Sequence, residues 1–487
     1  MSISSTLSSA LSGLTASSRA AEVVSSNIAN AMTDGYGVRR LDTASRQVGN
    51  NGSGVRVVGV TRQEDAILVA QRRLSGSNLA ATQTTSDFMA RFEAMIGSPD
   101  QPGSLSARMA EFEGRLVSAV NNPWSGAQLS NAVQGAQSVA EALNDLSNGI
   151  QDERLRADAD ISRAVGRINS ALEGLEELNK RILSTNAKGG EIASLLDAQG
   201  QLVDQIAPFI PLQARRENNG TLHLYSTDGQ VLLNHRAATL GFDPASGMDP
   251  FLTLTDGHLS GLTVNGTPLR LEGAHPAFEG GQLSAMFQLR DGLGPGAQAK
   301  IDAVARDLAA RFDAAGLDAT LAPGSPGLFT DAGAAVEAVN EIGLAGRLRV
   351  NAAVLPSQGG AEWRLRDGLG AAVEGPSGNA TYLTAQFEAL SATRTPASGG
   401  FSSTPRSMSG LISETLSIAG MNRSTAELSL SQSSARHTAL MAAELAGGVD
   451  TDDELQRLLK IEQMYAANAR VISVAEALMD ELMRIAQ

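Results

Sequence analysis

Both ends of this 487-residue chain carry apolar side chains at alternating steps of three and four residues, a period of about 3.5. The first row consists of Ile3, Leu7, Ala10, Leu14, Ala21, Val24 and Ile28. The second row consists of Leu458, Ile461, Tyr465, Asn468, Ile472, Ala475, Met479 and Leu482. This period favours helices that pack lengthwise on other helices, so the sequence predicts a coiled-coil-like seam at each end.

The two rows differ in depth and width. Ser17 interrupts the first row, whose remaining positions are mostly Ser, Thr or Ala, so the first seam is shallow. Asn468 lies in the second seam, where a polar residue sets the register at some cost in stability. A further apolar row makes the last helix wide enough for more than one neighbour, and it consists of Met464, Val471, Leu478 and Ile485.

Short motifs next to these rows predict where the helices end and begin. Gly35 follows the first row and can take the positive φ that ends a helix. Residues 451–454, Thr-Asp-Asp-Glu, place carboxylates at the predicted start of the last helix. The free amides and positive dipole end of a helix favour acidic groups there.

Two of the terminal motifs resemble a known family. Residues 26–36, Ser-Asn-Ile-Ala-Asn-Ala-Met-Thr-Asp-Gly-Tyr, resemble the N-terminal signature of bacterial flagellar rod, hook and hook-associated proteins. Residues 463–472 resemble the closing motif of the same families. Residues 195–205, 280–283 and 447–450 are similar to segments of the hook-associated junction proteins, although Asp450 replaces the usual Asn.

The resemblance implies a structural subunit that joins the flagellar hook to the filament. Its partners would be further copies of itself, hook protein, a filament-side hook-associated protein and an export chaperone at the C-terminal helix. It would leave the cell unfolded through the flagellar type III apparatus and lie in the extracellular flagellum, at the hook-filament junction. The alternative is another axial subunit, such as hook or rod protein, because these share both terminal motifs.

The assembly contacts are expected on the two terminal segments. On the first they are Leu7, Leu14, Val24, Asn27, Ile28, Asn30, Gly35 and Tyr36. On the last they are Tyr465, Asn468, Ile472, Met479 and Leu482.

Composition excludes several classes of protein. The net charge of −14 disfavours a nucleic-acid partner or an anionic membrane surface. The absence of cysteine excludes disulfides, thiol catalysis and cysteine-ligated metal. The start of the chain has no basic segment before an apolar core, so no cleaved secretory signal is expected.

The interior alternates between two patterns, which predicts a mainly helical α+β fold with small antiparallel β inserts. Helices are expected at 80–95, 105–120, 127–146 and 152–183, and again at 280–316. Hairpin dipeptides such as Asn219-Gly220 and Asn265-Gly266 predict a β-rich insert at 206–279. A second small β-rich insert is expected at 336–399, with the final helices starting near Ser407.

These elements predict domains that are discontinuous in sequence. Residues 1–60 with 430–487 would form the terminal coiled-coil assembly region. Residues 61–205, 280–335 and 400–430 would form a helical domain, from which the two inserts project.

Catalytic interpretations are weak. The five histidines, at positions 223, 235, 258, 275 and 437, show no metalloprotease spacing. Residues 292–296, Gly-Leu-Gly-Pro-Gly, lack the Gly-Lys-Ser/Thr ending of a phosphate-binding loop and predict a plain loop before a helix. We therefore expect no enzyme activity, cofactor or metal; a cell-wall hydrolase carried on an axial protein is the remaining enzymatic alternative.

Overall fold

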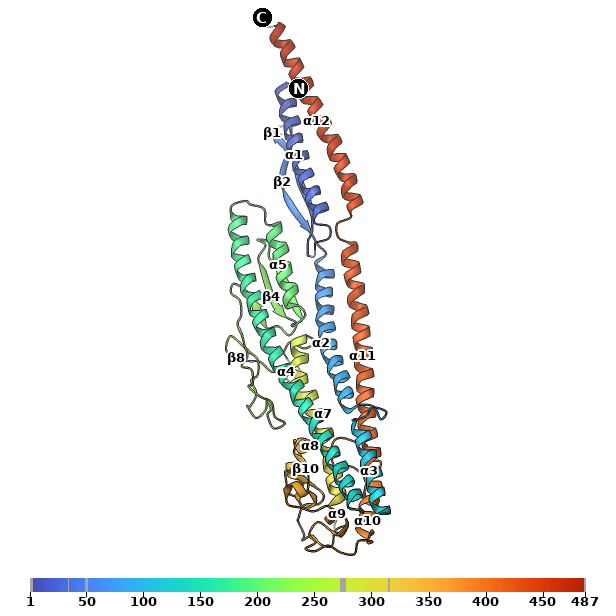
Figure 1. Ribbon diagram of the computed structural model, residues 1–487. Coiled ribbons are helices and arrows are strands. Elements are labelled where there is room, and N and C mark those ends of the chain that lie inside the picture. Colours follow the sequence, from blue (N-terminus) through green and yellow to red (C-terminus); the bar gives the residue numbers. More distant parts are fainter. Residues whose placement is uncertain (1–2, 34, 49–50, 272–276, 314–315, 486–487) are drawn as a thin grey trace.

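The computed structural model describes residues 3–33, 35–48, 51–271, 277–313 and 316–485, and the molecule is long and mainly helical (Figure 1). The first and last helices lie side by side at one end, together with a long β-hairpin. We call these elements the end region and the rest of the chain the shaft. The predicted mainly helical α+β class, with paired terminal helices and small antiparallel sheets, is confirmed.

The α-helices of the described residues are α1 (Ile3–Ala29), α2 (Ala66–Ile96), α3 (Leu105–Asn121), α4 (Gly126–Ala187), α5 (Ala193–Ile206), α6 (Gln282–Gln288), α7 (Gly294–Phe312), α8 (Leu344–Arg347), α9 (Arg364–Asp367), α10 (Thr381–Ser391), α11 (Met408–Ala446) and α12 (Thr451–Ile485). Shorter helical stretches are η1 (Leu289–Leu293), η2 (Ala338–Asn340), η3 (Ala352–Val354) and η4 (Pro356–Gln358).

The strands form small antiparallel sheets. They are β1 (Val38–Val48), β2 (Asn51–Gln63), β3 (Leu212–Arg216), β4 (Leu222–Ser226), β5 (Val231–Leu233), β6 (Leu240–Gly241), β7 (Thr263–Val264), β8 (Thr267–Pro268), β9 (Phe329–Asp331) and β10 (Leu348–Val350). Strands β1 and β2 form one hairpin, β9 pairs with β10, and the others form two sheets in the orders β3-β4-β5 and β6-β7-β8.

Side-chain caps explain where the long helices start. The carboxylate of Asp65 accepts hydrogen bonds from two amides of the first turn of α2. Ser104, Ser125 and Ser407 cap α3, α4 and α11 in the same way. Each cap satisfies an amide that has no partner within its helix, so a polar residue before an apolar row sets the helix start.

Helix α4 differs from the prediction, because the expected helices at 127–146 and 152–183 are one continuous helix of 62 residues. Gly149 lies in the predicted break, but a Cβ built there would lie 3.0 Å from the sulfur of Met95 on α2. The small residue therefore allows close helix packing at this point. Buried side chains on both sides of it, such as Leu146 and Ile150, keep the helix against the core.

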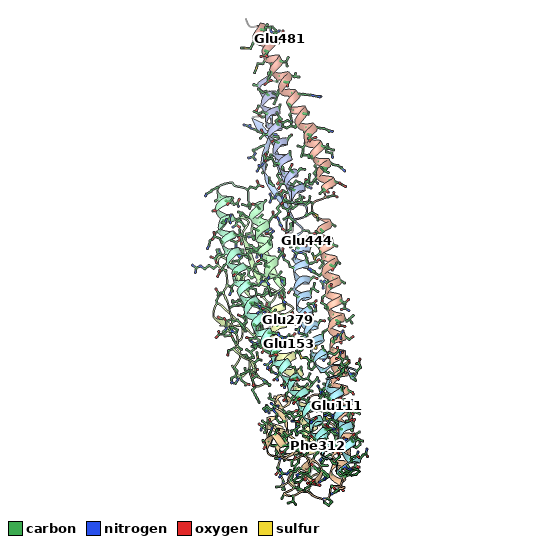
Figure 2. The ribbon with its side chains drawn as sticks, in the orientation of Figure 1. Glu111, Glu153, Glu279, Phe312, Glu444 and Glu481 are labelled. Carbon is green, nitrogen blue, oxygen red and sulfur yellow. The ribbon has the colours of Figure 1, made fainter. Side chains whose placement is uncertain are left out.

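The shaft has two apolar cores, one at each end of α4. The core far from the chain termini contains the aromatic rings of Phe112, Phe312 and Phe329, whose centroids are 5.2–6.1 Å apart. Figure 2 labels Phe312 in this core. The other core joins the second half of α4 to α5 and to the sheets of residues 212–268. Such burial supplies the main driving force for folding of the shaft.

The expected loop at 292–296 is wrong, because residues 282–312 are helical throughout. A π-helical stretch at η1 joins α6 to α7 without a break. A Cβ at Gly294 would lie 2.6 Å from the side chain of Arg154 and 2.9 Å from the carbonyl oxygen of Leu289. Glycine is therefore needed for close approach, and Pro295 follows it directly, at the junction between η1 and α7.

The predicted β-structure is present in the first insert and largely missing from the second. In the first, Asn265 and Gly266 both have positive φ, 52° and 79°, as expected for a hairpin turn between β7 and β8. The expected β-rich character of 336–399 is wrong, because that segment has one strand, β10, among short helices and turns. Its apolar side chains alternate too briefly to distinguish a strand from a turn that packs on α4 and α7.

Four fully buried arginines hold the loops of the shaft in place. The guanidinium of Arg154 donates to the carbonyl oxygens of Arg290, Asp249 and Leu252. Arg311 donates to the carbonyl oxygens of Ala389, Leu390, Ala392 and Arg406. Arg290 donates to the carbonyl oxygen of Ser260, and Arg366 donates to that of Pro123. A planar guanidinium has five donors, so one side chain satisfies several carbonyls that a lysine could not.

Candidate assembly site at the paired terminal helices

Helices α1 and α12 run antiparallel with a single register. Asn27 contacts Glu454 and Gly13 contacts Asn468, and the residue numbers of each pair add up to 481. Glycine is required at position 13, because a Cβ there would lie only 2.7–2.8 Å from the amide group of Asn468. Asn468, which the sequence indicated as a register residue, thus lies opposite the one glycine of α1.

Most predicted seam positions are buried or half-buried. On α1 they are Ile3, Leu7, Ala10, Leu14, Ala21, Val24 and Ile28, and Ser17 is buried as well. On α12 they are Leu458, Ile461, Asn468, Ile472 and Ala475. Three predicted positions are instead exposed in this chain, namely Tyr465, Met479 and Leu482, at 49%, 45% and 53%.

The N-terminal signature residues form a buried polar joint. The Nδ2 of Asn27, a fully buried residue, donates to the carbonyl oxygen of Arg39 at 2.9 Å and to Glu454 at 3.1 Å. Its Oδ1 accepts from the hydroxyl of Tyr36 at 2.9 Å and from the amide of Arg39 at 3.0 Å. The carboxylate of Glu454 also pairs with Arg457. Asn27 thus ties α1, the hairpin and the start of α12 together.

Asn30 and Gly35 complete the turn after α1. The Asn30 amide donates to the carbonyl oxygen of Ser26 at 2.8 Å, which closes the last turn. Gly35 has φ +76°, the left-handed conformation expected after a helix, and lies against Gln201 of α5. Asp34, which forms part of the same predicted stop signal, lies outside the described residues.

A second polar cluster fastens the end region to the shaft. Asp197 on α5 accepts from the amide of Gly37, from Nη2 of Arg39 and from Nε of Arg62, at 3.2, 3.0 and 2.7 Å. Asp197 and Glu454 were missed as site residues by sequence reasoning. Asp197 lies in the family-like stretch 195–205, which was the one available signal, while Glu454 was interpreted only as a helix-start charge.

The hairpin β1–β2 packs lengthwise on α1. The hydroxyl of Ser12 accepts from the amide of Val55 at 3.1 Å, and a Cβ at Gly54 would lie 2.1 Å from that same hydroxyl oxygen. The small residues that made the first seam shallow therefore allow α1 to contact a helix and a hairpin at once (Figure 1).

Part of α12 is left uncovered by the described residues. We define the open row as Met464, Val471, Val474, Leu478 and Ile485, which are 40–74% exposed. An apolar groove of about 260 Å³ lies between this row and the start of α1, lined by Ile3, Thr6, Arg470, Val471, Val474, Ala475 and Leu478. Past residue 478 the described part of α1 offers no partner, and α12 projects beyond it (Figure 1).

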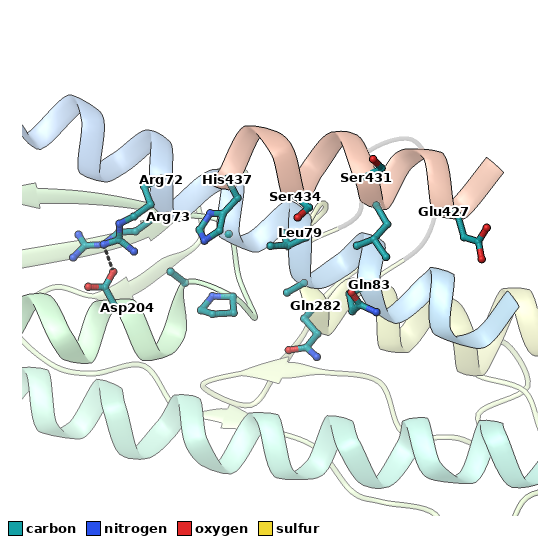
Figure 3. Close-up of a pocket in the computed structure, with 15 residues that line it drawn as sticks. Arg72, Arg73, Leu79, Gln83, Asp204, Gln282, Glu427, Ser431, Ser434 and His437 are labelled. Carbon is teal, nitrogen blue, oxygen red and sulfur yellow. Dashed lines mark hydrogen bonds and ion pairs between the residues drawn. The ribbon is translucent and has the colours of Figure 1, made fainter. Parts of the chain in front are cut away.

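A larger groove, of about 790 Å³, lies on the shaft between α2, α11 and the end of α5 (Figure 3). Arg72 and Arg73 both pair with Asp204 at 2.8 Å, and His437 of α11 faces them. The charged groups largely neutralise each other, and among the described residues no hydrogen bond joins Ser431 or Ser434 of the groove to His437. Among the described residues there is no cluster of three or more potential metal ligands. No helix in the described ranges is long and apolar enough to cross a membrane.

Comparisons with known proteins match different parts of the chain to different flagellar families. Residues 89–328 match the family described as flagellar hook-associated protein FlgK helical domain. Residues 7–36 match the flagella basal body rod protein family, and residues 446–485 match the C-terminal family of the flagellar basal body rod FlgEFG proteins. The two terminal matches cover most of α1 and α12.

Several relatives carry the name flagellar hook-associated protein 1. The one from Bacillus subtilis is 26% identical over 250 residues, which are 48% of this chain and 49% of the relative. The one from Escherichia coli is 24% identical over 331 residues, 64% of this chain and 59% of the relative. The matched regions thus span about half the length of these relatives.

A solved structure, the flagellar hook junction protein FlgK from Burkholderia pseudomallei, is also similar. It has 19% sequence identity and a TM-score of 0.42, over 54% of this chain and 46% of that one. The family matches and the named relatives point to the same group of flagellar proteins. With a middle that matches the FlgK helical domain and two ends that match flagellar axial families, the chain is similar to flagellar hook-associated protein 1 in its middle and at both ends.

Proposed function

We propose that this chain is a structural subunit of the bacterial flagellum that joins the hook to the filament and assembles with itself through α1 and α12. The open row of α12 carries this proposal. Its apolar side chains stay 40–74% exposed although α12 already packs on α1, so this surface is left over after the seam has formed. Burial of such surface contributes about 25 cal/mol per Å², enough to drive association with neighbouring helices.

The predicted interface residues fit this proposal in two different ways. Leu7, Leu14, Val24 and Ile28 of α1, with Asn468 and Ile472 of α12, build the seam and so hold the open row in position. Asn27, Asn30, Gly35 and Tyr36 fasten the turn at its base. The exposed Tyr465, Met479 and Leu482 are the members of the set that are free to contact another subunit.

The proposed partners are further copies of this chain, hook protein on the hook side of the junction and a hook-associated protein on its filament side. An export chaperone that covers the open row before assembly is part of the proposal, as is export of the unfolded chain without cleavage. The working location is the extracellular flagellum at the hook-filament junction. The proposed domain division keeps a terminal coiled-coil assembly region, 1–60 with 430–487, apart from the helical domain and the two inserts. Residues 430–446 of that region are the last part of α11, which packs on α2 in the shaft.

The alternative function is that of another axial subunit, such as hook or rod protein. The terminal matches alone do not separate the two functions, because rod and hook families share them. The match of residues 89–328 to the hook-associated helical domain favours the junction subunit.

Electron microscopy of a strain that lacks this gene tests the proposal. Complete hooks without filaments are expected, whereas a loss of the hooks themselves would support the alternative. A version without residues 1–36 should remain a soluble monomer and fail to restore filaments. Normal motility with that version would overturn the proposal.

No catalytic step forms part of the proposed function. Incubation of the purified chain with peptidoglycan should release no soluble fragments. Repeatable hydrolysis that a shaft variant abolishes would instead support the cell-wall hydrolase alternative.

A further inference from the structure

The hairpin β1–β2 is basic although the whole chain carries a net charge of −14. Residues 38–63 contain five arginines and one aspartate. Arg39 and Arg62 pair with Asp197 of the shaft, and Arg40 lies at the hairpin base beside the acidic start of α12. Arg46 and Arg56 are exposed, and within the described residues no hydrogen bond or ion pair engages their guanidinium groups.

Helix α12 carries unpaired acids on one flank. We define the acidic flank as Glu462, Glu476 and Asp480, each of which directly follows a seam position. The side chains of the acidic flank are exposed, and no described residue forms an ion pair with them. Successive helix residues are about 100° apart, so the flank lies on one side of the seam.

The open row lies on the other side of that seam. Each of Val471, Val474 and Leu478 directly precedes a seam position, whereas each acid of the flank directly follows one. Because successive helix residues are about 100° apart, the open row and the acidic flank lie on opposite sides of the seam. The basic hairpin packs on α1, whereas the acidic flank lies on α12, so the end region carries its two charged surfaces on different elements.

From these two surfaces we propose that neighbouring copies of this chain dock head to tail, with the Arg46 and Arg56 side of one hairpin against the acidic flank of α12 of the next copy. This inference rests on the self-assembly proposed above and names the contact that orients it. Two unlike, complementary surfaces on one chain produce a heterologous interface, which builds rings or helical arrays and not closed pairs. The charges would steer and orient neighbours, while the open row supplies apolar burial.

The positions of the charges require a modest axial shift between copies. The amide of Val55 bonds to Ser12, so the outer half of the hairpin lies at the level of Ser12 on α1. The register with α12 places Glu476 at the level of Ser5. Seven residues of helix span roughly 10 Å, so a shift of about that size brings the arginines to the acids of a neighbour.

Charge reversal tests the contact. The variant Arg46→Glu with Arg56→Glu should lower the number of filaments per cell about tenfold when it is the only copy in the strain. Arg181→Glu with Arg215→Glu, two exposed shaft arginines without ion pairs in the described residues, is the matched control with the same change of net charge. Circular dichroism and thermal unfolding of each purified monomer establish that both variants fold.

A mixing experiment separates contacts between copies from effects within one copy. The variant Glu476→Arg with Asp480→Arg should also fail alone, because its flank then repels the native hairpin. Coexpression of the two failing variants should restore filaments, because each reversed surface then meets an opposite charge on the other chain. One chain with all four substitutions should assemble as well.

The outcomes distinguish this inference from the proposed function. If removal of residues 1–36 abolishes filaments while the hairpin variant behaves like the shaft control, the head-to-tail contact is wrong and the junction function stands. If each charge variant fails but coexpression restores nothing, the hairpin binds a different partner and the inference is likewise overturned. If the truncated chain still restores filaments, the proposed function itself is wrong.

Discussion

Gly13 of α1 and Asn468 of α12 face each other across the seam so closely that a Cβ on Gly13 would lie 2.7 Å from the amide nitrogen of Asn468. The Asn468 amide also donates to the carbonyl oxygen of Met464 at 3.0 Å, which keeps the side chain along its own helix. The pair therefore marks the register of two helices that lie at opposite ends of the sequence.

A disulfide at this pair would test the register. The chain has no native cysteine, so Gly13→Cys with Asn468→Cys introduces the sole possible bond. Disulfides need Cβ atoms about 3.5–4.5 Å apart. A Cβ at Gly13 would lie 2.8 Å from Cγ of Asn468, one bond beyond the Asn468 Cβ, which is compatible with that spacing. We expect rapid oxidation within one molecule, seen as a gel shift without reductant that is independent of concentration. Gly13→Cys with Ala477→Cys is the control and should not form that bond; the reverse result would mean another register.

Asn27→Ala should loosen the base of the end region. The substitution removes one partner of the buried Glu454 carboxylate and leaves the hydroxyl of Tyr36 without an acceptor at Asn27. Loss of a partner for buried polar groups costs about 1–3 kcal/mol, which hydrogen exchange at the start of α12 would detect as faster exchange. Asn30→Ala, at a less buried asparagine of the same motif, is the control. Equal exchange in the two variants would contradict the role of Asn27.

Asp197→Asn should weaken the connection between the hairpin and the shaft. Arg39 and Arg62 would lose their shared negative partner, although one acceptor oxygen would remain. The free energy of local opening should fall by about 1–3 kcal/mol, so the amides of residues 37–62 should exchange faster. Glu191→Gln removes the exposed pair with Arg19 and should change exchange by less than about 0.5 kcal/mol. Unchanged exchange in Asp197→Asn would show that packing on α1 alone holds the hairpin.

Asp302 makes the stability of the shaft depend on pH. Burial raises the pKa of its carboxyl to about 6 from an ordinary 3.8, despite hydrogen bonds from the amides of Gly343 and Ala345. The folded state thus binds the proton more tightly than the unfolded chain, so this group stabilises the fold progressively as pH falls from 7 to 4.

The variant Asp302→Asn isolates that effect. The difference in pKa corresponds to about 3 kcal/mol in full, and wild type should gain about 2 kcal/mol of it relative to Asp302→Asn between pH 7 and pH 4, because the unfolded carboxyl is still partly ionised at pH 4. Urea unfolding of both proteins at several pH values measures this difference. Parallel curves for the two proteins would mean that Asp302 does not titrate in this range.

Local sequence patterns predicted the elements whose geometry is local. Ser407 marked the start of α11, because a cap bonds to amides within its own first turn. Asn265 and Gly266 marked a hairpin, because that turn needs two positive φ angles. The continuous α4 was missed, because the fate of Gly149 depended on Met95 of another helix.

The same distinction holds for the assembly site. The 3.5-residue period by itself determined that both ends are helices with one apolar face, because the helix repeat places those residues on one side. It did not determine which positions stay free of a neighbour, and Tyr465, Met479 and Leu482 are exposed although they share the period. Only the tertiary structure decided that Glu454 would meet Asn27 and that Asp197 would hold Arg39 and Arg62 of the hairpin. Asn27 and Glu454 are 427 positions apart, and Asp197 is 158 positions from Arg39 and 135 from Arg62, so no local period relates these partners.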